Sequence, residues 1–122
     1  MPSDTHEQLL GMAEDWLQQL GFDIGRPAHT ARFKPDVLAC KYEGERMCEE
    51  IFVEVETCTS LHLPHTIDQL VEIEEEALKR GKKPRHKASG ILVVPVDCEL
   101  NARFYVLTEG FETIDVKAFR VP

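Results

Sequence analysis

The sequence predicts an α/β domain in which a mixed central β-sheet is flanked by helices. Two kinds of hydrophobic periodicity, one helical and one strand-like, alternate along the chain. Residues 90–96 are almost all apolar, which is typical of a strand covered on both of its faces. Because helices alternate with strands after an antiparallel meander, we expect the order α-β-β-β-α-β-α-β within a single domain over residues 1–122.

The first half of the chain predicts one helix followed by three strands. Apolar residues recur at three- and four-residue steps over residues 4–20, which predicts an amphipathic helix. Residues 22–28 predict only a short edge strand, because a glycine and a proline in this stretch weaken a central one. Two stronger strands are predicted over residues 36–42 and 49–57, with a tight turn between them at residues 43–46.

The second half alternates helix and strand. Pro64 stands just before a helical pattern at about residues 65–80, and Gly81 is placed to end it. The apolar strand at residues 90–96 follows a basic loop. A last helix and a last strand are predicted over residues 98–109 and 112–121.

The composition is that of an ordinary soluble globular protein, with 43% hydrophobic and 30% charged residues. No apolar run approaches the roughly 20 residues that a membrane span needs, and residues 1–10 lack the basic start and apolar core of a signal peptide. We therefore expect a cytoplasmic protein without a membrane partner. In that compartment its cysteines should be reduced thiols: Cys40, Cys48, Cys58 and Cys98.

A zinc site is the weaker interpretation of these cysteines. Cys58, His62 and His65 form the nearest cluster of metal ligands, but zinc sites usually join two close pairs, and the second pair is missing. Buried small hydrophobic residues and loop histidines explain the pattern better.

Three carboxylates form the most informative pattern in the chain. Glu54 and Glu56 are two residues apart in a β-branched run, so both side chains leave the same face of a strand. Asp36 lies near the start of the neighbouring strand, and a tight hairpin brings it close to them. Three anions at close range repel each other, and a hard cation such as Mg²⁺ or Mn²⁺ relieves that repulsion. The alternative is an acidic strand face that only provides solubility.

The stretch "PDVLA", followed some twenty residues later by "IFVEVET", resembles the core motif of the PD-(D/E)XK nuclease superfamily. Asp36 stands at the first motif position and Glu54 at the second. The resemblance covers the order of elements over about residues 5–118 and implies a restriction-endonuclease-like fold. It also implies a Mg²⁺- or Mn²⁺-dependent nuclease acting on nucleic acid, with DNA favoured over RNA. The implied metal ligands are Asp36, Glu54 and the backbone carbonyl of Val55.

One departure from the superfamily pattern concerns catalysis. Glu56 occupies the position of the usual motif lysine. A glutamate cannot supply the positive charge, but it can act as general base or as a further metal ligand. An inactive relative, retained as a nucleic-acid-binding or protein-interaction module, is therefore the alternative to an active nuclease.

Members of this superfamily often bring further polar groups to the metal. The candidates on the first helix are Glu7 and Glu14, for which a helix-capping acid and a solvated acid are the alternatives. Gln69 on the second helix matches half of a Q-x-x-x-Y pattern, because Ile73 replaces the tyrosine.

A basic segment stands out against the net charge of −8. Residues 79–87 contain six Lys or Arg residues, so the rest of the chain is still more acidic. The candidate contacts to nucleic-acid phosphates are Lys82, Lys83, Arg85 and Lys87. The alternative is a solvated loop that balances the acidic helix before it.

Because cutting both strands of a duplex requires two sites, we also expect a two-fold homodimer.

Overall fold

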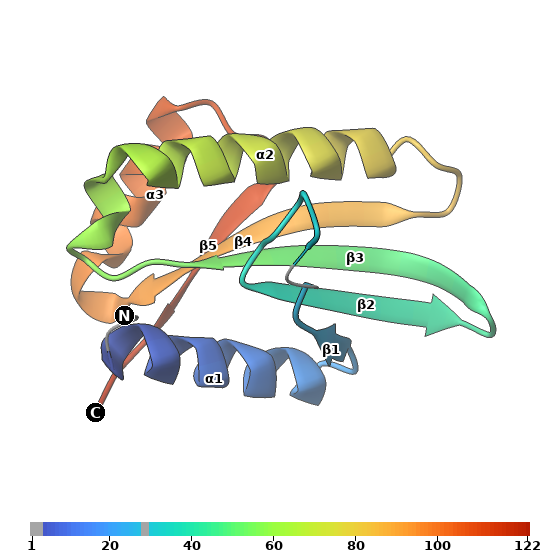
Figure 1. Cartoon of the computed structure of the whole chain (residues 1–122), viewed down its shortest axis with the longest axis horizontal. Helices are drawn as coiled ribbons and strands as arrows, with labels where there is room; N and C mark the ends of the chain where they lie inside the picture. The colour runs from blue at the N-terminus through green and yellow to red at the C-terminus, as the bar shows by residue number, and fades with distance from the viewer. Residues whose placement is uncertain (1–3, 28–29) are drawn as a thin grey trace.

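The computed structural model describes residues 4–27 and 30–122 and contains a five-stranded mixed sheet flanked by helices (Figure 1). The strands lie in sequence order across the sheet, β1-β2-β3-β4-β5. The predicted α/β class and the order α-β-β-β-α-β-α-β are both confirmed.

The first three strands form an antiparallel meander. A short edge strand β1 (Asp23–Gly25) pairs with β2 (Val37–Glu43), and β2 turns into the long β3 (Arg46–Val55). Gly44 takes a φ of 65° in this turn, a conformation that glycine adopts without a steric penalty. The register pairs Val37 with Val53, so the start of β2 lies beside the end of β3. Asp36 and the Glu54–Glu56 segment are thereby brought to the same end of the sheet.

The last three strands are parallel, and helices connect them. Helix α2 (Pro64–Arg80) links β3 to β4 (Lys87–Pro95), and α3 (Glu99–Thr108) links β4 to β5 (Ile114–Phe119). Short 3-10 turns, Ser60–His62 and Val96–Cys98, precede the two helices. Such crossovers are required between parallel neighbours, because a hairpin can join only antiparallel strands.

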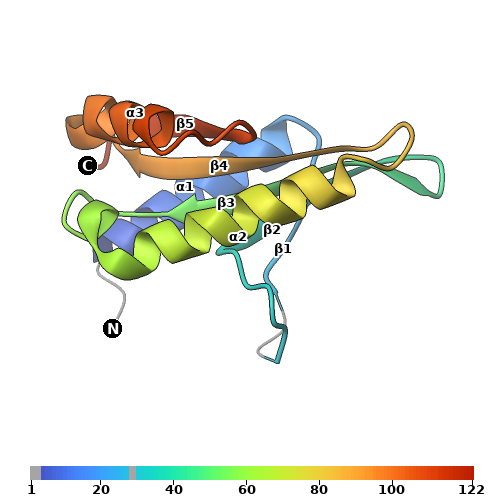
Figure 2. The ribbon, with the colours of Figure 1, turned by 90° about the horizontal axis from the view of Figure 1, so that it is seen from above.

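Helices lie on both faces of the sheet (Figures 1 and 2), and the sheet separates two hydrophobic cores. Helix α1 (Asp4–Gln19) covers one face, where Leu9 and Leu17 pack against alternate residues of β3, among them Val53 and Val55. Helices α2 and α3 cover the other face, where Phe52 of β3 is fully buried. The alternation of β3 thus assigns Phe52 and Glu54 to the α2 side, and Glu56 follows directly after the strand, which ends at Val55, two residues earlier than predicted.

The boundaries of two strands differ from the prediction. β3 begins at Arg46 and β4 at Lys87, each three residues earlier than expected. The start of β3 is extended by its pairing with β2, where Arg46 lies opposite Glu43, and the start of β4 by the pairing of Lys87 with Glu49. The edge strand predicted over residues 22–28 is present only as the three-residue strand β1 (Asp23–Gly25). Ala28, at its predicted end, lies outside the described residues. No helix in the described ranges is both long and apolar enough to cross a bilayer.

The expectation that all four cysteines are thiols is wrong for one pair. Cys58 and Cys98 form a disulfide with a Cα–Cα distance of 5.7 Å, while Cys40 and Cys48 are free. The pairing follows from the parallel register: Val55 lies beside Val93, so the loops that follow β3 and β4 start at the same edge. Cys58 is therefore engaged with a cysteine and not with a zinc ion.

Candidate functional site

The three predicted carboxylates line one pocket, of about 670 Å³, where β2 starts and β3 ends. Asp36, Glu54 and Glu56 share this pocket with the N-terminal turns of α1 and α2 and with the loop after β3. The pocket has no Arg or Lys among its lining residues. Among the described residues, the basic side chains beside these acids are therefore histidines, His6 and His65.

Asp36 is fixed by the backbone of the neighbouring strand. The amide of Val55 donates a hydrogen bond to Asp36 Oδ2 at 2.7 Å. Pro35, which precedes it, is buried. The carboxylate side chain itself remains 27% exposed and lies 3.7 Å from Nε2 of His6. Asp36 therefore faces the pocket, on the same side as Glu54.

Glu54 is the most buried of the three carboxyl groups, at 3% exposure. Burial is the largest cause that raises its pKa from the ordinary value of 4.5 to about 10, and the charge of Asp36 and a hydrogen bond with Asp36 contribute to the same total shift. Glu54 is consequently neutral at pH 7 in the isolated protein. Asp36 and Glu54 are thus held side by side, and their mutual repulsion prevents both from being ionised unless a positive charge lies nearby.

Glu56 is also buried, at 4% exposure, and the loop after β3 holds it. The Ser60 hydroxyl donates a short hydrogen bond to Glu56 Oε2 and accepts one from the Thr57 amide at 2.9 Å. Burial raises the pKa of Glu56, and the hydrogen bond from Ser60 partly offsets that shift. The Glu56 carboxylate is therefore oriented by a hydroxyl group, whereas the hydrogen-bond partner of Glu54 is another carboxyl group, that of Asp36.

The sequence did not identify Ser60 as a residue of the site. It contains His6 and His65 but does not show where their side chains point. Ser60 stands four residues after Glu56 in a turn-forming stretch, which is the one signal that it could return to the strand end. His6 and His65 line the pocket together with Gln69. Gln69 Oε1 is buried and meets no hydrogen-bond donor within the described ranges.

Two of the candidate accessory acids lie outside the pocket. Glu7 is exposed on α1, and neither it nor Glu14 lines the cavity. Glu14 forms an ion pair with Arg26, with Oε1 3.0 Å from Nη2. The helix presents His6 to the carboxylates, and Glu7 follows it on another face because successive helical residues are about 100° apart.

The carboxylate pocket offers oxygen donors, the type of ligand that Mg²⁺ and Mn²⁺ prefer. Within residues 4–27 and 30–122, no group of three His, Cys, Asp or Glu side chains is arranged to hold a metal. Asp36 and Glu54 nevertheless place two hard oxygen donors side by side at a pocket wall. Mg²⁺ typically uses only one or two protein carboxylates and completes its shell with waters and substrate phosphates. The pair fits such an open site, and Val55, whose amide is already used by Asp36, lies in the same wall.

The basic segment lies at the other end of α2 from these acids (Figure 1). α2 spans Pro64–Arg80, about 25 Å at 1.5 Å per residue. The predicted phosphate contacts are all exposed and follow the C-terminus of this helix: Lys82, Lys83, Arg85 and Lys87. The structure therefore separates the candidate phosphate contacts from the carboxylate pocket by the length of a helix.

Comparisons with protein-family models, with curated proteins and with solved structures gave no significant match.

Proposed function

We propose that this protein is a divalent-metal-dependent nuclease that hydrolyses phosphodiester bonds, with DNA favoured over RNA as substrate. The observation that carries the proposal is the shared pocket, in which Asp36 and Glu54 meet from neighbouring strands with no Arg or Lys among the described lining residues. Such a pair is costly for a fold to bury and is typical of functional sites. The order of elements and the motif residues of the PD-(D/E)XK superfamily support the same interpretation.

Each residue of the pocket has a distinct role in this proposal. Asp36 and Glu54 bind Mg²⁺ or Mn²⁺, and the backbone carbonyl of Val55 is a further ligand. When bound, the ion supplies Lewis-acid stabilisation of the negative charge that develops on the phosphate. Glu56, oriented by Ser60, accepts a proton from the attacking water as general base. Gln69 offers a buried amide to the substrate or to that water.

The proposal includes a two-fold homodimer, because one pocket per chain cuts one strand. A surface suited to self-association exists on α3, where Leu100, Phe104 and Leu107 are 82%, 68% and 76% exposed. Their spacing places them on one face of the helix. Sedimentation equilibrium is expected to give a dimer at micromolar concentration, and Phe104→Lys should make it monomeric. A wild-type monomer at that concentration would remove this part of the proposal.

The direct test of function is the variant Asp36→Asn. Plasmid or oligonucleotide cleavage in the presence of Mg²⁺ should fall by roughly 100-fold or more, because the variant loses a charged ligand of the ion that stabilises the transition state. The amide oxygen of asparagine can still accept the hydrogen bond from Val55, so the fold should persist. Asp115→Asn, on the exposed side of β5, removes the same charge far from the pocket and should cleave like the wild type.

The alternative of an inactive binding module makes the opposite prediction. It requires that the wild type neither binds Mg²⁺ or Mn²⁺ nor cleaves any DNA or RNA offered. Nucleic-acid binding without cleavage, unaffected by chelation of divalent ions, would favour this alternative.

A further inference from the structure

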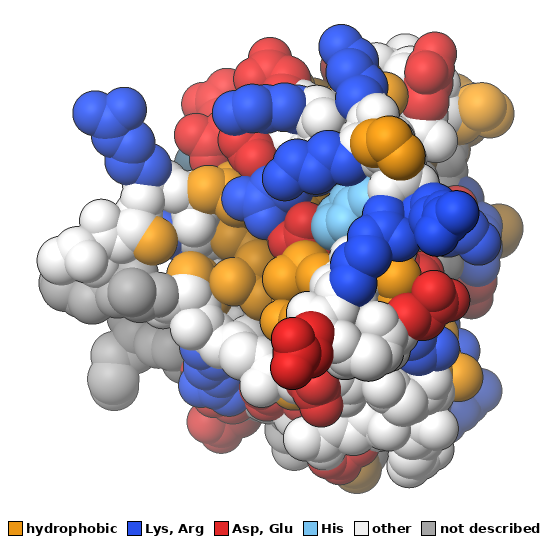
Figure 3. All heavy atoms as spheres, turned by 90° about the vertical axis from the view of Figure 1, so that its right-hand side faces the viewer, with side chains coloured by type: hydrophobic (Ala, Val, Ile, Leu, Met, Phe, Trp, Pro, Cys, Tyr) orange, Lys and Arg blue, Asp and Glu red, His pale blue; other side chains and the backbone are white. Residues whose placement is uncertain are grey.

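A second pocket, of about 610 Å³, lies at the opposite end of the molecule from the carboxylate pocket. It is formed where β3 begins, where α2 ends and where the loop of residues 81–86 leads to β4. Figure 3 looks onto this end and shows Lys and Arg side chains around a hollow that has apolar side chains and a histidine at its floor. We call it the basic pocket, and its lining is Arg46, Met47, Glu50, Glu76, Lys79, Arg80, Lys83 and His86.

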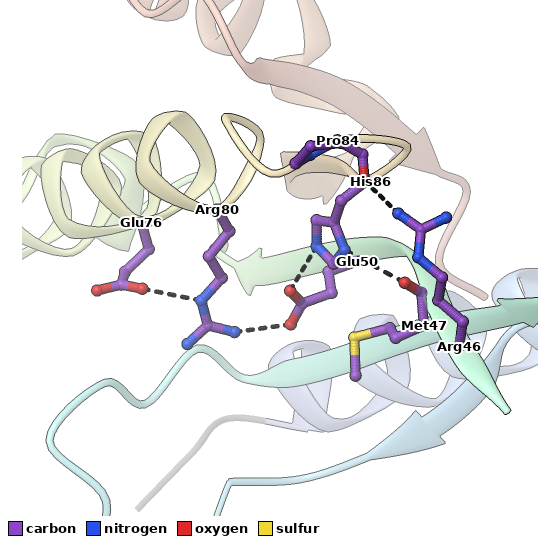
Figure 4. Close-up of polar contacts among 7 residues, drawn as sticks. All are labelled: Arg46, Met47, Glu50, Glu76, Arg80, Pro84 and His86. Atoms are coloured by element: carbon purple, nitrogen blue, oxygen red, sulfur yellow. Dashed lines mark hydrogen bonds and ion pairs between the residues drawn. The ribbon is translucent and has the colours of Figure 1, made fainter.

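A buried glutamate organises the floor of the basic pocket (Figure 4). The Glu50 side chain is 10% exposed and lies between two basic groups. Arg80 Nη1 is 2.6 Å from one of its oxygens, and His86 Nε2 is 2.8 Å from the other. The His86 side chain is itself only 7% exposed. The floor is therefore a fixed polar network and not a set of mobile surface side chains.

The walls of the basic pocket are tied to each other. Arg80 Nε donates to Glu76 at 2.9 Å, which fixes the guanidinium against α2. The side chain of Arg46 donates to the carbonyl of Pro84, which joins the start of β3 to the loop (Figure 4). Arg80 also lies over the ring of Phe52, with 5.1 Å between the guanidinium carbon and the ring centroid. These contacts fix the positions of two arginines from separate elements.

The charges of the basic pocket exceed what its internal pairs neutralise. Four Lys or Arg residues face two glutamates, although the whole chain carries −8. Lys79 and Lys83 have no carboxylate within ion-pair distance among the described residues. Arg80 Nη2 likewise has no acceptor in the ranges that the structure describes. Several strong donors thus converge on a hollow that an anion can enter.

Compensation of the helix dipole explains only part of this cluster. Lys79 and Arg80 lie in the last turn of α2, where cations are favoured at the negative end of a helix. Arg46 comes from β3, however, and Lys83 and His86 come from the loop, so neither the dipole nor the helix accounts for them. Guanidinium and ammonium groups that converge from three elements suit a multiply charged tetrahedral anion.

We infer that the basic pocket is a binding site for a phosphate group, separate from the carboxylate pocket. The ligand is either a phosphodiester of a nucleic-acid backbone or a free phosphorylated small molecule, which present the same chemistry to these donors. The inference goes beyond the proposed nuclease activity, because it assigns a ligand to residues that take no part in the hydrolysis. It also revises the predicted phosphate contacts: Lys79 and Lys83 line the basic pocket, whereas Lys82 and Lys87 lie outside its lining and are not assigned to the phosphate.

The test uses inorganic phosphate, titrated into the full-length protein by NMR in the presence of EDTA. Saturable shifts of the His86 ring and of the Glu50 amide are expected. Lys79→Ala/Lys83→Ala should weaken binding by about tenfold or more, since two charged donors are lost. Lys82→Ala/Lys87→Ala removes the same charge outside the pocket lining and should change binding by less than about twofold.

Two results would overturn the inference. One is the absence of saturable phosphate binding, and the other is an equal loss in both double variants, which would indicate only a diffuse positive field. Both variants change exposed lysines, and unchanged circular dichroism confirms that they fold. Because EDTA removes divalent ions, failure of the nuclease proposal would leave this result unaffected.

A second arm identifies the source of the phosphate group. A 12-nucleotide DNA without terminal phosphates is added as competitor to the phosphate-bound protein. Displacement of phosphate assigns the basic pocket to a nucleic-acid backbone, and the salt dependence of that binding should lose nearly one unit of log–log slope for each lysine removed. Phosphate binding without displacement by the DNA assigns it to a free phosphorylated molecule.

Discussion

Glu54 connects the chemistry of the carboxylate pocket to the stability of the fold. Its carboxyl group is buried beside Asp36, and its pKa is raised to about 10 in the folded protein. The unfolded chain releases this proton near the ordinary value of 4.5. Between these two pH values the folded state holds one more proton than the unfolded state, so stability falls as pH rises across that window. Below about pH 4.5 the carboxyl group of Glu54 is protonated in both states, and the stability associated with its protonated form is fully present.

The variant Glu54→Gln should remove that pH dependence. Glutamine is neutral at every pH and similar in size, so we expect it to be more stable than the wild type at pH 8 by roughly 1–3 kcal/mol. The difference should shrink towards zero near pH 4, where the wild-type carboxyl is protonated in both states. Urea unfolding at pH 4, 6 and 8 measures this. Parallel stability curves for the two proteins would contradict the assignment of Glu54 as a buried, protonated acid.

At the scale of single residues, the sequence predicts the carboxylates well and their surroundings poorly. The alternation of β3 is sufficient to place Glu54 and Glu56 on one face, because side chains in a strand alternate strictly. Their burial and the hydrogen bond from Ser60 depend on how the loop after β3 folds back. A loop has no hydrophobic period, so its path cannot be derived from the pattern of the sequence.

At the scale of elements, Gly90 shows how closely β4 and α2 approach. A Cβ atom at this position would lie 2.4 Å from Ile73 Cγ2 and 3.1 Å from Ile114 Cγ1. Both isoleucines are buried, in the core on the α2 side of the sheet. The helix and the strand are therefore in contact through a residue without a side chain, which fixes the distance between α2 and the sheet.

Gly90→Ala should destabilise the protein by roughly 1–3 kcal/mol, since overpacking a rigid core forces side chains off their preferred rotamers. Gly11→Ala is the matched control, because a Cβ at Gly11 in α1 meets no atom within 4 Å. That change should be neutral or stabilise the helix by up to about 1 kcal/mol. Equal unfolding midpoints for the two variants in guanidinium chloride would show that the close approach at Gly90 is absent.

The order of elements was predictable because each has a clear hydrophobic period or an uninterrupted apolar run. Their relative placement was not. The basic segment and the carboxylates lie at opposite ends of the molecule because α2 runs along the sheet between them, an orientation that the hydrophobic pattern alone does not give (Figure 1). Glu7 and Glu14, the candidates on the first helix, lie outside the carboxylate pocket because of the rotation of α1 about its axis. That rotation is set by the packing of Leu9 and Leu17 on the sheet and presents His6 instead.

At the scale of the whole molecule, the Cys58–Cys98 disulfide joins the two loops at the carboxylate end of the sheet. It closes a segment of 40 residues that includes α2 and β4. Such a cross-link stabilises mainly by restricting the unfolded chain, by about 2–4 kcal/mol. Cys58 is followed by Thr59 and Ser60, which line the carboxylate pocket, so the disulfide also anchors the loop that holds Glu56.

Reduction of the disulfide should lower the free energy of unfolding by about that 2–4 kcal/mol. Chemical denaturation with and without dithiothreitol measures the change in the wild type. The variant Cys58→Ala/Cys98→Ala should be similarly destabilised and should not respond to the reductant, because the remaining Cys40 and Cys48 are already free. A wild type that is insensitive to dithiothreitol would contradict a disulfide at this position.

The most direct test of a metal site at Asp36 and Glu54 is isothermal titration calorimetry. MnCl₂ is titrated into the wild-type protein at pH 8, and the titration is repeated with Asp36→Asn. If Asp36 and Glu54 form an ion site, the wild type binds Mn²⁺ saturably and Asp36→Asn loses that binding. The control Asp115→Asn, with the same change of charge, binds like the wild type. Absence of binding to the wild type, or undiminished binding to Asp36→Asn, would contradict the assignment of these carboxylates to a metal.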